Sequence, residues 1–293
     1  MESEQPMNAT PVTPTTDPEQ ARRDIDEHGI AILTGVLNAA EVADIRRRLF
    51  DAIALSEADG VPTRGYPFDP DKHNIRVFHL FNLDPVFVDL IQRPVALEYV
   101  RQMLGDEFLI SNFSANITEP GNQRMLLHAD QGYALPPWPD RPLACNVSWL
   151  LDDLNEENGG TRYVPGSHLL GRGPREGESY ETLGVAAPAG SIVVLDGRVW
   201  HQTGANRTHS GQRAALFGYY ALRWLRPQIN WNTALWSETV AGLEPSFLHR
   251  LGYYTGNTEF QVPNGIRAPL RAPQELDVGN QRFALGNEAG AGE

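Results

Sequence analysis

Two histidines and one aspartate near the middle of the chain have the types and spacing of a metal-ligand set. His128-Ala129-Asp130 forms a His-x-Asp motif, and His201 lies further on in Val199-Trp200-His201-Gln202-Thr203. Residues i and i+2 of a strand point to the same face, so His128 and Asp130 can reach one ion. Two imidazoles and one carboxylate on one face of a divalent ion suit a non-heme Fe(II) oxygenase. The pattern therefore predicts a protein that activates dioxygen.

The His-x-Asp pair is weak evidence on its own. With 8 histidines and 37 acidic residues among 293 positions, about one His-x-acid pair is expected by chance. A surface pair at a strand end is the plainer explanation of the pair alone. Its context favours the metal site, because the strand-like run Arg124-Met125-Leu126-Leu127 precedes it and Gln131-Gly132 ends the run.

Two histidines compete to be the third ligand. His168 lies in the turn Val164-Pro165-Gly166-Ser167-His168, whereas His201 follows the apolar run Ile192–Leu195 and stands beside Trp200. A metal ligand must be held rigidly, so His201 is favoured, and we expect a local turn hydrogen bond for His168. The other histidines lack ligand partners at useful spacing and are expected to be ordinary polar residues: His28, His73, His79, His209 and His249.

Arg213 stands at the start of an apolar run, Ala214 to Tyr220, twelve residues after His201. A charged residue that enters an apolar strand is costly unless it is paired. Its guanidinium group offers a fixed fork that matches a carboxylate. Thr203, two residues after His201, would share its face and add a hydroxyl donor. The spacing predicts an anchor for an acidic co-substrate, and the alternative is a solvent-facing arginine at a strand end.

Helical signals dominate the part of the chain before Gly105. Asn38 and Glu41 have the spacing of a capping box, and the following apolar positions keep helical periodicity. Pro94 interrupts a later helical stretch, and Gly105 stops it. The predicted elements are a helix over 21–29, a strand over 30–33, a helix from Asn38, and helical stretches over 84–93 and 95–104.

After Gly105 the pattern changes to short apolar runs separated by Gly, Pro, Asn and Asp, which is typical of strands and turns. The predicted strands cover 108–118, 143–151, 191–195 and 213–222, and Pro245 to Leu251 is predicted to be a short helix. Helices followed by a run of strands predict a mainly β protein with flanking α-helices, of the β-sandwich or jelly-roll type.

The composition excludes several classes of partner. A net charge of −13 argues against nucleic acid or an anionic membrane as the main partner, and no run is long enough to span a bilayer. Cys145 is the single cysteine, so no intrachain disulfide forms and a reducing, cytoplasmic compartment fits best. Lys72 is the only lysine among 24 basic residues, and this arginine bias of a high-GC genome predicts a bacterial source.

The ends of the chain differ in composition from its body. Residues 1–18 are rich in Thr, Pro and Glu without the pattern of a signal peptide, and we expect a disordered lead-in there. Residues 286–293 are expected to be a disordered tail. Residues 19–285 between them are predicted to form a single domain.

Four motifs taken together resemble the phytanoyl-CoA dioxygenase family. They are His128-x-Asp130, the stretch from Asn158-Gly159-Gly160-Thr161 to Pro165-Gly166-Ser167-His168, His201-x-Thr203, and Arg213. Members of this family are Fe(II)- and 2-oxoglutarate-dependent oxygenases with a double-stranded β-helix, a distorted jelly roll with N-terminal helices. The similarity runs from about Glu19 to Tyr254.

The resemblance implies roles for individual residues. His128, Asp130 and His201 would hold iron, and Arg213 would bind the distal carboxylate of 2-oxoglutarate with help from the Thr203 hydroxyl. The family's reaction consumes O₂, converts 2-oxoglutarate to succinate and CO₂, and oxidises a substrate carbon, usually to an alcohol. Desaturation, epoxidation and ring rearrangement also occur in the family. Related halogenases lack the carboxylate, so Asp130 favours hydroxylase chemistry.

The substrate is expected to be a hydrophobic small molecule in natural-product tailoring, because apolar and aromatic residues can wall a pocket. Core packing is the alternative for each of these aromatic residues. The candidate pocket residues are Phe113, Tyr133, Trp138, Trp149 and Trp231. Two other classes stay open: a cupin-like metal oxygenase that does not use 2-oxoglutarate, and a non-catalytic jelly-roll protein that binds small molecules. The oligomeric state stays open too.

Overall fold

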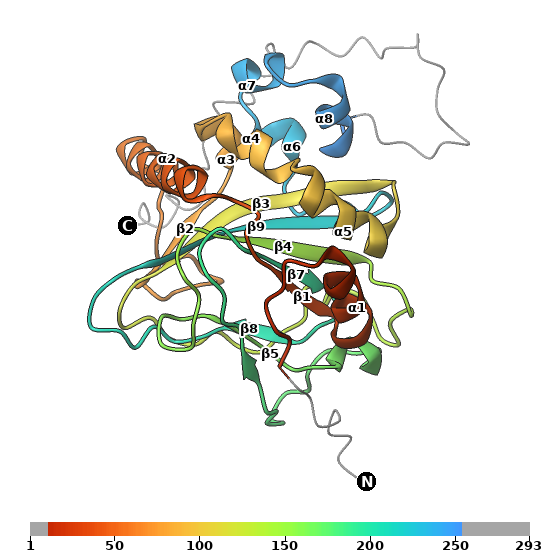
Figure 1. The fold of residues 1–293 in the computed structure, drawn as a ribbon. Helices are drawn as coiled ribbons and strands as arrows, with labels where there is room; N and C mark the ends of the chain where they lie inside the picture. Colours follow the sequence, from red (N-terminus) through yellow and green to blue (C-terminus); the bar gives the residue numbers. More distant parts are fainter. Residues whose placement is uncertain (1–10, 254–293) are drawn as a thin grey trace, which may run out of the picture.

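The computed structural model describes residues 11–253 and contains two antiparallel sheets (Figure 1). The larger sheet has six strands in the order β1 (Ile30–Leu33), β7 (Ile192–Asp196), β4 (Ala144–Leu150), β9 (Arg213–Leu222), β3 (Phe108–Thr118) and β2 (Asn74–Val77). The smaller sheet has three strands in the order β6 (Leu183–Gly184), β5 (Thr161–Tyr163) and β8 (His201–Thr203). Chain neighbours are rarely sheet neighbours, as a jelly roll requires.

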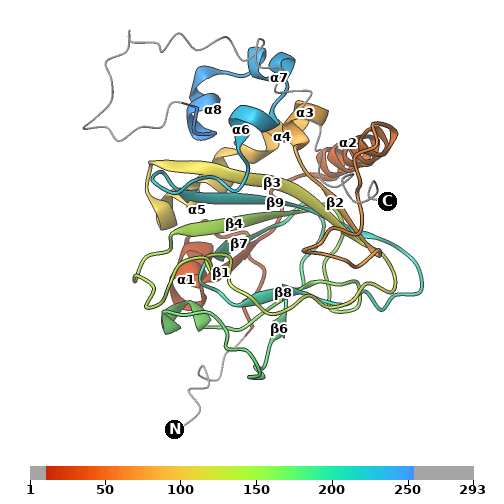
Figure 2. The same ribbon diagram turned by 180° about the vertical axis from the view of Figure 1, so that it is seen from behind.

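Most helices cover the face of the larger sheet that points away from the smaller one, and Figure 2 shows this from behind. The helices are α1 (Pro18–His28), α2 (Ala39–Ala58), α3 (Leu80–Leu83), α4 (Val86–Ile91), α5 (Pro94–Leu104), α6 (Trp231–Ala234), α7 (Ser237–Ala241) and α8 (Pro245–Arg250). Asn38 caps α2 in a complete capping box with Glu41, as predicted. None of the helices within residues 11–253 is both long and apolar enough to cross a membrane.

Side chains alternate between the two faces of the larger sheet. On β4, Cys145, Val147 and Trp149 belong to the core that the sheet shares with the helices. Asn146 and Ser148 point to the opposite face, which lies toward the smaller sheet, and both side chains are buried there. The functional side chains described below all come from this inner face or from the loops at its edge.

The predicted fold class is confirmed, and the long strands over 108–118 and 213–222 have the predicted bounds. The short strands β2, β5, β6 and β8 and the helices α3, α6 and α7 were not predicted. The first helix begins earlier than expected, because Asp17 caps it and Pro18 is its first residue.

Residues 11–17, which the composition places in a disordered lead-in, pack against the body of the protein. Val12 is buried and its backbone N–H donates to the Tyr163 hydroxyl at 2.9 Å. Thr15 forms a parallel bridge with Leu33 at the edge of the larger sheet. Apolar contact and backbone pairing thus order this segment, whereas residues 1–10 and the predicted tail lie outside the described residues.

Candidate metal and co-substrate site

The two candidate histidines are cross-strand neighbours. His201 is the first residue of β8, and His128 pairs with it in an isolated antiparallel bridge. Backbone hydrogen bonds run in both directions, from His128 N–H to the His201 carbonyl at 3.0 Å and back at 2.8 Å. The predicted strand over 124–127 is absent; this segment follows β8 irregularly, with Met125 N–H donating to the Thr203 carbonyl at 3.0 Å. Pairing with β8 therefore positions His128.

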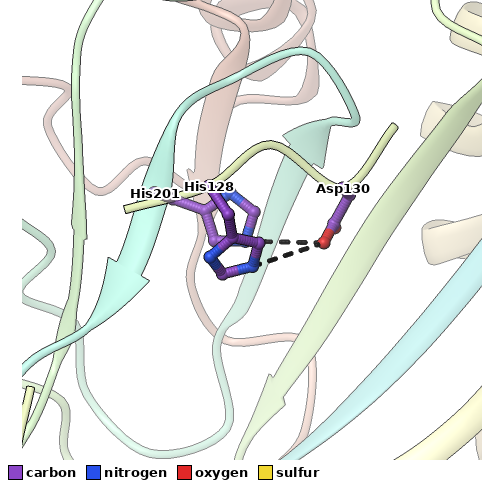
Figure 3. A group of neighbouring side chains, drawn as sticks. All are labelled: His128, Asp130 and His201. Carbon is purple, nitrogen blue, oxygen red and sulfur yellow. Dashed lines mark ion pairs between the residues drawn. The ribbon is translucent and has the colours of Figure 1, made fainter. Parts of the chain in front are cut away.

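The triad converges on one point (Figure 3). Asp130 Oδ1 lies 3.9 Å from His128 Nε2 and 3.7 Å from His201 Nε2. One ligand atom from each of the three residues lies within 4.8 Å of the others. This donor set fits a divalent ion that accepts imidazole and carboxylate, and it leaves one side of the ion open.

The outer nitrogens of both imidazoles are already engaged. His128 Nδ1 lies 3.0 Å from the Leu126 carbonyl, and His201 Nδ1 lies 2.9 Å from the Val199 carbonyl. A carbonyl accepts, so each Nδ1 carries the proton and each Nε2 keeps its lone pair for a metal. Burial and the neighbouring His201 ring lower the pKa of His128, and Asp130 opposes them. The imidazole is thus kept neutral, as a ligand must be.

Two side chains of the larger sheet hold Asp130 in place. Asn146 of β4 donates from Nδ2 to Asp130 Oδ2 at 3.3 Å, and the Tyr219 hydroxyl of β9 donates to the Asp130 carbonyl at 3.0 Å. Asn146 and Tyr219 are register partners, so they stand side by side on the inner face. Neither residue is predicted from the sequence, although a polar residue inside the apolar run of β4 is a usable signal for Asn146.

Arg213 is buried on the inner face of β9, with only 1% of its surface exposed. Its Nη2 donates to the Gly159 carbonyl at 2.7 Å, and its Nε has no hydrogen-bond partner. Within residues 11–253 it forms no ion pair. Burial, followed by the charge of Arg76, lowers the pKa of Arg213 to about 10. The charge of Asp152 opposes these effects without forming an ion pair with Arg213. A buried cation that forms no ion pair fits a ligand carboxylate.

The motif Asn158-Gly159-Gly160 forms the wall against which Arg213 lies. Gly159 adopts a left-handed conformation with φ of +80°. A Cβ on Gly160 would stand 2.4 Å from the Asn155 carbonyl oxygen, so no larger residue fits there. The two glycines thus allow the loop to pass close to β8, where Gly204 N–H donates to the Gly160 carbonyl at 3.0 Å.

The triad opens onto a cavity of about 160 Å³ between the sheets. Thr203 lines it, whereas Arg213 lies behind the wall rather than in it. Polar and apolar groups line it in about equal measure, whereas a mostly apolar pocket was expected. Besides the triad, the lining residues are Arg76, Asn112, Ser114, Met125, Asn146, Thr161, Leu195, Gln202, Thr203, Phe217, Tyr219 and Gln228.

The predicted pocket residues mostly lie elsewhere. Phe113, Trp149 and Trp231 are wrong, because they are buried in the core between the larger sheet and the helices; Phe113 and Trp149 occupy the outer-face positions of their strands. Trp138 packs in a separate cluster with Trp200. Tyr133 does not line the cavity either, but its half-exposed side chain interacts with Tyr219, which does.

His168 does not join the triad. It lies on a 3₁₀ turn, Ser167–Leu170, and is 2% exposed. Its ring packs closely against Gly29, and Nε2 lies 3.4 Å from the Asp26 carbonyl at the end of α1. The choice of His201 over His168 thus agrees with the grouping of the side chains. The partner of His168 is another element rather than its own turn.

Two facing antiparallel sheets with two histidines and a carboxylate converging between them define a jelly-roll metalloenzyme of the non-heme iron type. The family profile described as phytanoyl-CoA dioxygenase (PhyH) matches residues 25–215. The chain belongs to this family, so it is an Fe(II)- and 2-oxoglutarate-dependent dioxygenase that uses O₂. The predicted resemblance is confirmed.

Curated relatives agree with this assignment. The chain is 41% identical to "Dioxygenase af480" of Aspergillus fumigatus over 247 residues, which cover 82% of this chain and 80% of that protein. "Dioxygenase trt7" of Aspergillus terreus is 27% identical over 212 residues, covering 69% and 73%. Both come from fungi, so the bacterial source predicted from the arginine bias is not supported.

Solved structures show the same fold. The carbocyclase SnoK from nogalamycin biosynthesis matches with a TM-score of 0.58 and 21% identity, covering 80% of this chain and 94% of that one. HygX from Streptomyces hygroscopicus, solved with nickel, 2-oxoglutarate and hygromycin B, matches with a TM-score of 0.56 and 18% identity, covering 71% and 88%. The expected oxygenase jelly roll is thereby confirmed.

Proposed function

We propose that the protein hydroxylates a C–H bond of a small molecule in the biosynthesis of a natural product, with His128, Asp130 and His201 as the iron ligands. The observation that carries the proposal is the convergence of both Nε2 atoms on Asp130 Oδ1, 3.9 and 3.7 Å away. Retention of the carboxylate favours hydroxylation over halogenation. The relatives support the biosynthetic context, since SnoK is named for nogalamycin biosynthesis.

The buried arginine supplies the second part of the proposal. Arg213 binds the distal carboxylate of 2-oxoglutarate through its free Nε edge, and the Thr203 hydroxyl donates to the same group. When bound, iron and 2-oxoglutarate supply the O₂-dependent oxidation. The chain's own task is to hold three ligand atoms on one side of the ion and to engage both Nδ1 atoms with backbone carbonyls, so that each Nε2 faces the ion. Asn146 and Tyr219 keep Asp130 from turning away.

An anaerobic titration with Fe(II) followed by 2-oxoglutarate tests the proposal. The chelate of both gives a weak visible charge-transfer band, which should require both additions and disappear in His201→Ala. Asp130→Ala should abolish substrate oxidation, and intact turnover would remove Asp130 from the ligand set. If the protein binds Fe(II) but gives no band, it fits a cupin-like oxygenase that does not use 2-oxoglutarate. If it binds no metal, it fits a non-catalytic jelly-roll protein that binds small molecules.

A further inference from the structure

The inner face of the larger sheet holds hydrogen-bond acceptors that neither the metal site nor the co-substrate uses. Asn146 Oδ1 is buried and has no partner. Its orientation is fixed, because Nδ2 of the same amide faces the carboxylate of Asp130, which only accepts. The oxygen must therefore face away from Asp130, and Asn146 lines the cavity.

A second acceptor lies across Tyr219 from the first. Asn112 of β3 is paired in register with Tyr219, as Asn146 is from the other side on β4. Asn112 Oδ1 is likewise buried without a partner, while its Nδ2 donates to Gln228 Oε1 at 3.1 Å. Adjacent strands lie about 4.8 Å apart, so Asn112 and Asn146 stand roughly 10 Å apart with Tyr219 between them.

An irregularity in β3 presents Asn112 to the cavity. The register shifts between Ile110 and Asn112, which leaves Ser111 as an extra residue. Ser111 fixes the segment after β9, because its Oγ accepts from Gln228 N–H at 2.8 Å and its carbonyl accepts from Ile229 N–H at 3.0 Å. Bulges near functional sites commonly redirect a side chain in this way. The two hydrogen bonds of Ser111 thus hold Gln228 beside Asn112.

2-Oxoglutarate cannot satisfy these acceptors. Its two carboxylates and its ketone only accept hydrogen bonds at neutral pH. A buried acceptor without a partner is costly, so a molecule that donates hydrogen bonds is the fitting occupant of this end of the cavity.

We propose that Asn112 and Asn146 form an acceptor subsite for hydroxyl or amine groups of the substrate. The substrate is then an already oxygenated or aminated small molecule rather than a hydrocarbon, and a reaction that installs O–H or N–H must precede this one. The inference rests on the proposed function, since it places the substrate against the same metal centre. It replaces the hydrophobic substrate expected from the sequence.

A matched pair of small probes tests the subsite. Cyclohexanol donates and accepts a hydrogen bond, whereas cyclohexanone only accepts, and both dissolve at millimolar concentration. With Mn(II) in place of Fe(II) and 2-oxoglutarate present, paramagnetic broadening of the probe's NMR lines reports binding beside the metal. We expect cyclohexanol to bind roughly fivefold more tightly, the effect of one hydrogen bond. Asn112→Leu should reduce this preference, and Asn112→Asp, which keeps an acceptor, should retain it.

If Mn(II) broadens the NMR lines of both probes equally, or of neither probe, the subsite is overturned. Water would then be the partner of the two amide oxygens. A full preference that survives Asn112→Leu would remove Asn112 from it. The wild-type charge-transfer band with Fe(II) and 2-oxoglutarate separates the two proposals. Its absence defeats the proposed function, whereas a normal band without any preference for the alcohol defeats only the subsite.

Discussion

Asp130 presents its two carboxylate oxygens to different neighbours. Oδ1 faces the Nε2 atoms of both histidines, and Oδ2 accepts from Asn146 Nδ2 at 3.3 Å. A carboxylate held on one oxygen offers the other to a metal as a single ligand. Partners of this kind orient ligands and raise metal affinity, so the candidate site extends beyond the three proposed ligands.

Replacing Asn146 with leucine should therefore weaken iron binding. The side chain keeps its approximate size but loses the donor to Asp130, and we expect Fe(II) affinity to fall roughly tenfold or more. Anaerobic Fe(II) titration measures the effect. Ser148→Ala is the control, because Ser148 lies two residues along the same face of β4 and its Oγ has no partner. Equal affinities in the two variants would show that Asn146 does not orient Asp130.

The two candidate third ligands should behave oppositely. His201→Ala removes an imidazole whose Nε2 points at Asp130 Oδ1, so metal binding should be lost. His168→Ala should retain iron, because that ring packs against Gly29 and lies outside the triad. Metal content after dialysis with Fe(II) distinguishes the variants. Release of the metal from His168→Ala would reverse the assignment.

Arg213 should govern the 2-oxoglutarate requirement without affecting the metal. A charge-assisted hydrogen-bonded pair is worth roughly 1.5–3 kcal/mol, so Arg213→Ala should raise the 2-oxoglutarate concentration for half-maximal charge-transfer absorbance by an order of magnitude or more. Arg213→Lys keeps the charge but loses the forked geometry of the guanidinium group. Its half-maximal 2-oxoglutarate concentration should therefore lie between those of the wild type and Arg213→Ala. An unchanged requirement in Arg213→Ala would place the anchor elsewhere.

At the scale of elements, the turn between β7 and β8 connects the His128–Asp130 segment to His201. Arg198 in this turn forms a two-pronged ion pair with Asp196, at 3.0 and 2.7 Å, and also donates to the Pro139 and Asp140 carbonyls. Gly197 accepts from Gln131 N–H at 2.9 Å, one residue after Asp130. The turn thus ties the loop after Asp130 to the strand that carries His201.

Arg198→Met should destabilise the protein strongly. Arg198 and Asp196 have only 8% and 4% of their side chains exposed, so the change leaves a buried carboxylate without its partner. Breaking such a pair costs about 3–5 kcal/mol of unfolding free energy. Urea unfolding measures it, and Arg198→Met combined with Asp196→Leu should recover part of the loss. A loss of unfolding free energy below about 1 kcal/mol is typical of exposed ion pairs. It would show that the Arg198–Asp196 pair does not stabilise this turn.

For the molecule as a whole, the reactivity of one buried thiol reports on the packing between the larger sheet and the helices. Cys145 is the single cysteine and is fully buried on the outer face of β4. Burial, with a contribution from Asp196 and Asp130, raises the pKa of its thiol well above the ordinary value. The thiol therefore stays protonated and shielded, and unreactive.

We expect no reaction of the native protein with DTNB over minutes and one reacting thiol per chain in denaturant. The rate of reaction in intermediate urea should then follow opening of this core. The same reaction with Ala21→Asp, which places a charge in the same core, should be faster. Rapid labelling of the native wild type would show that the core opens locally instead.

The sequence by itself determined the long elements and the chemistry of the ligands. Capping residues and apolar periodicity predicted α2 at Asn38. A roughly alternating run predicted β3 and an apolar run predicted β9, both with their bounds. The types of His128, Asp130 and His201 limited the metal chemistry. These signals are local, so they can be read without knowing the fold.

Only the tertiary structure decided which side chains meet. β8 has three residues, too few to show a strand period, and its pairing with the His128 segment joins residues far apart in sequence. β4 is buried on both faces, so its sequence does not tell that Trp149 faces the helices while Asn146 faces the metal site. Because that difference depends on what packs against each face, the sequence could name the candidate ligands but not the side chains that contact them on the inner face of the sheet.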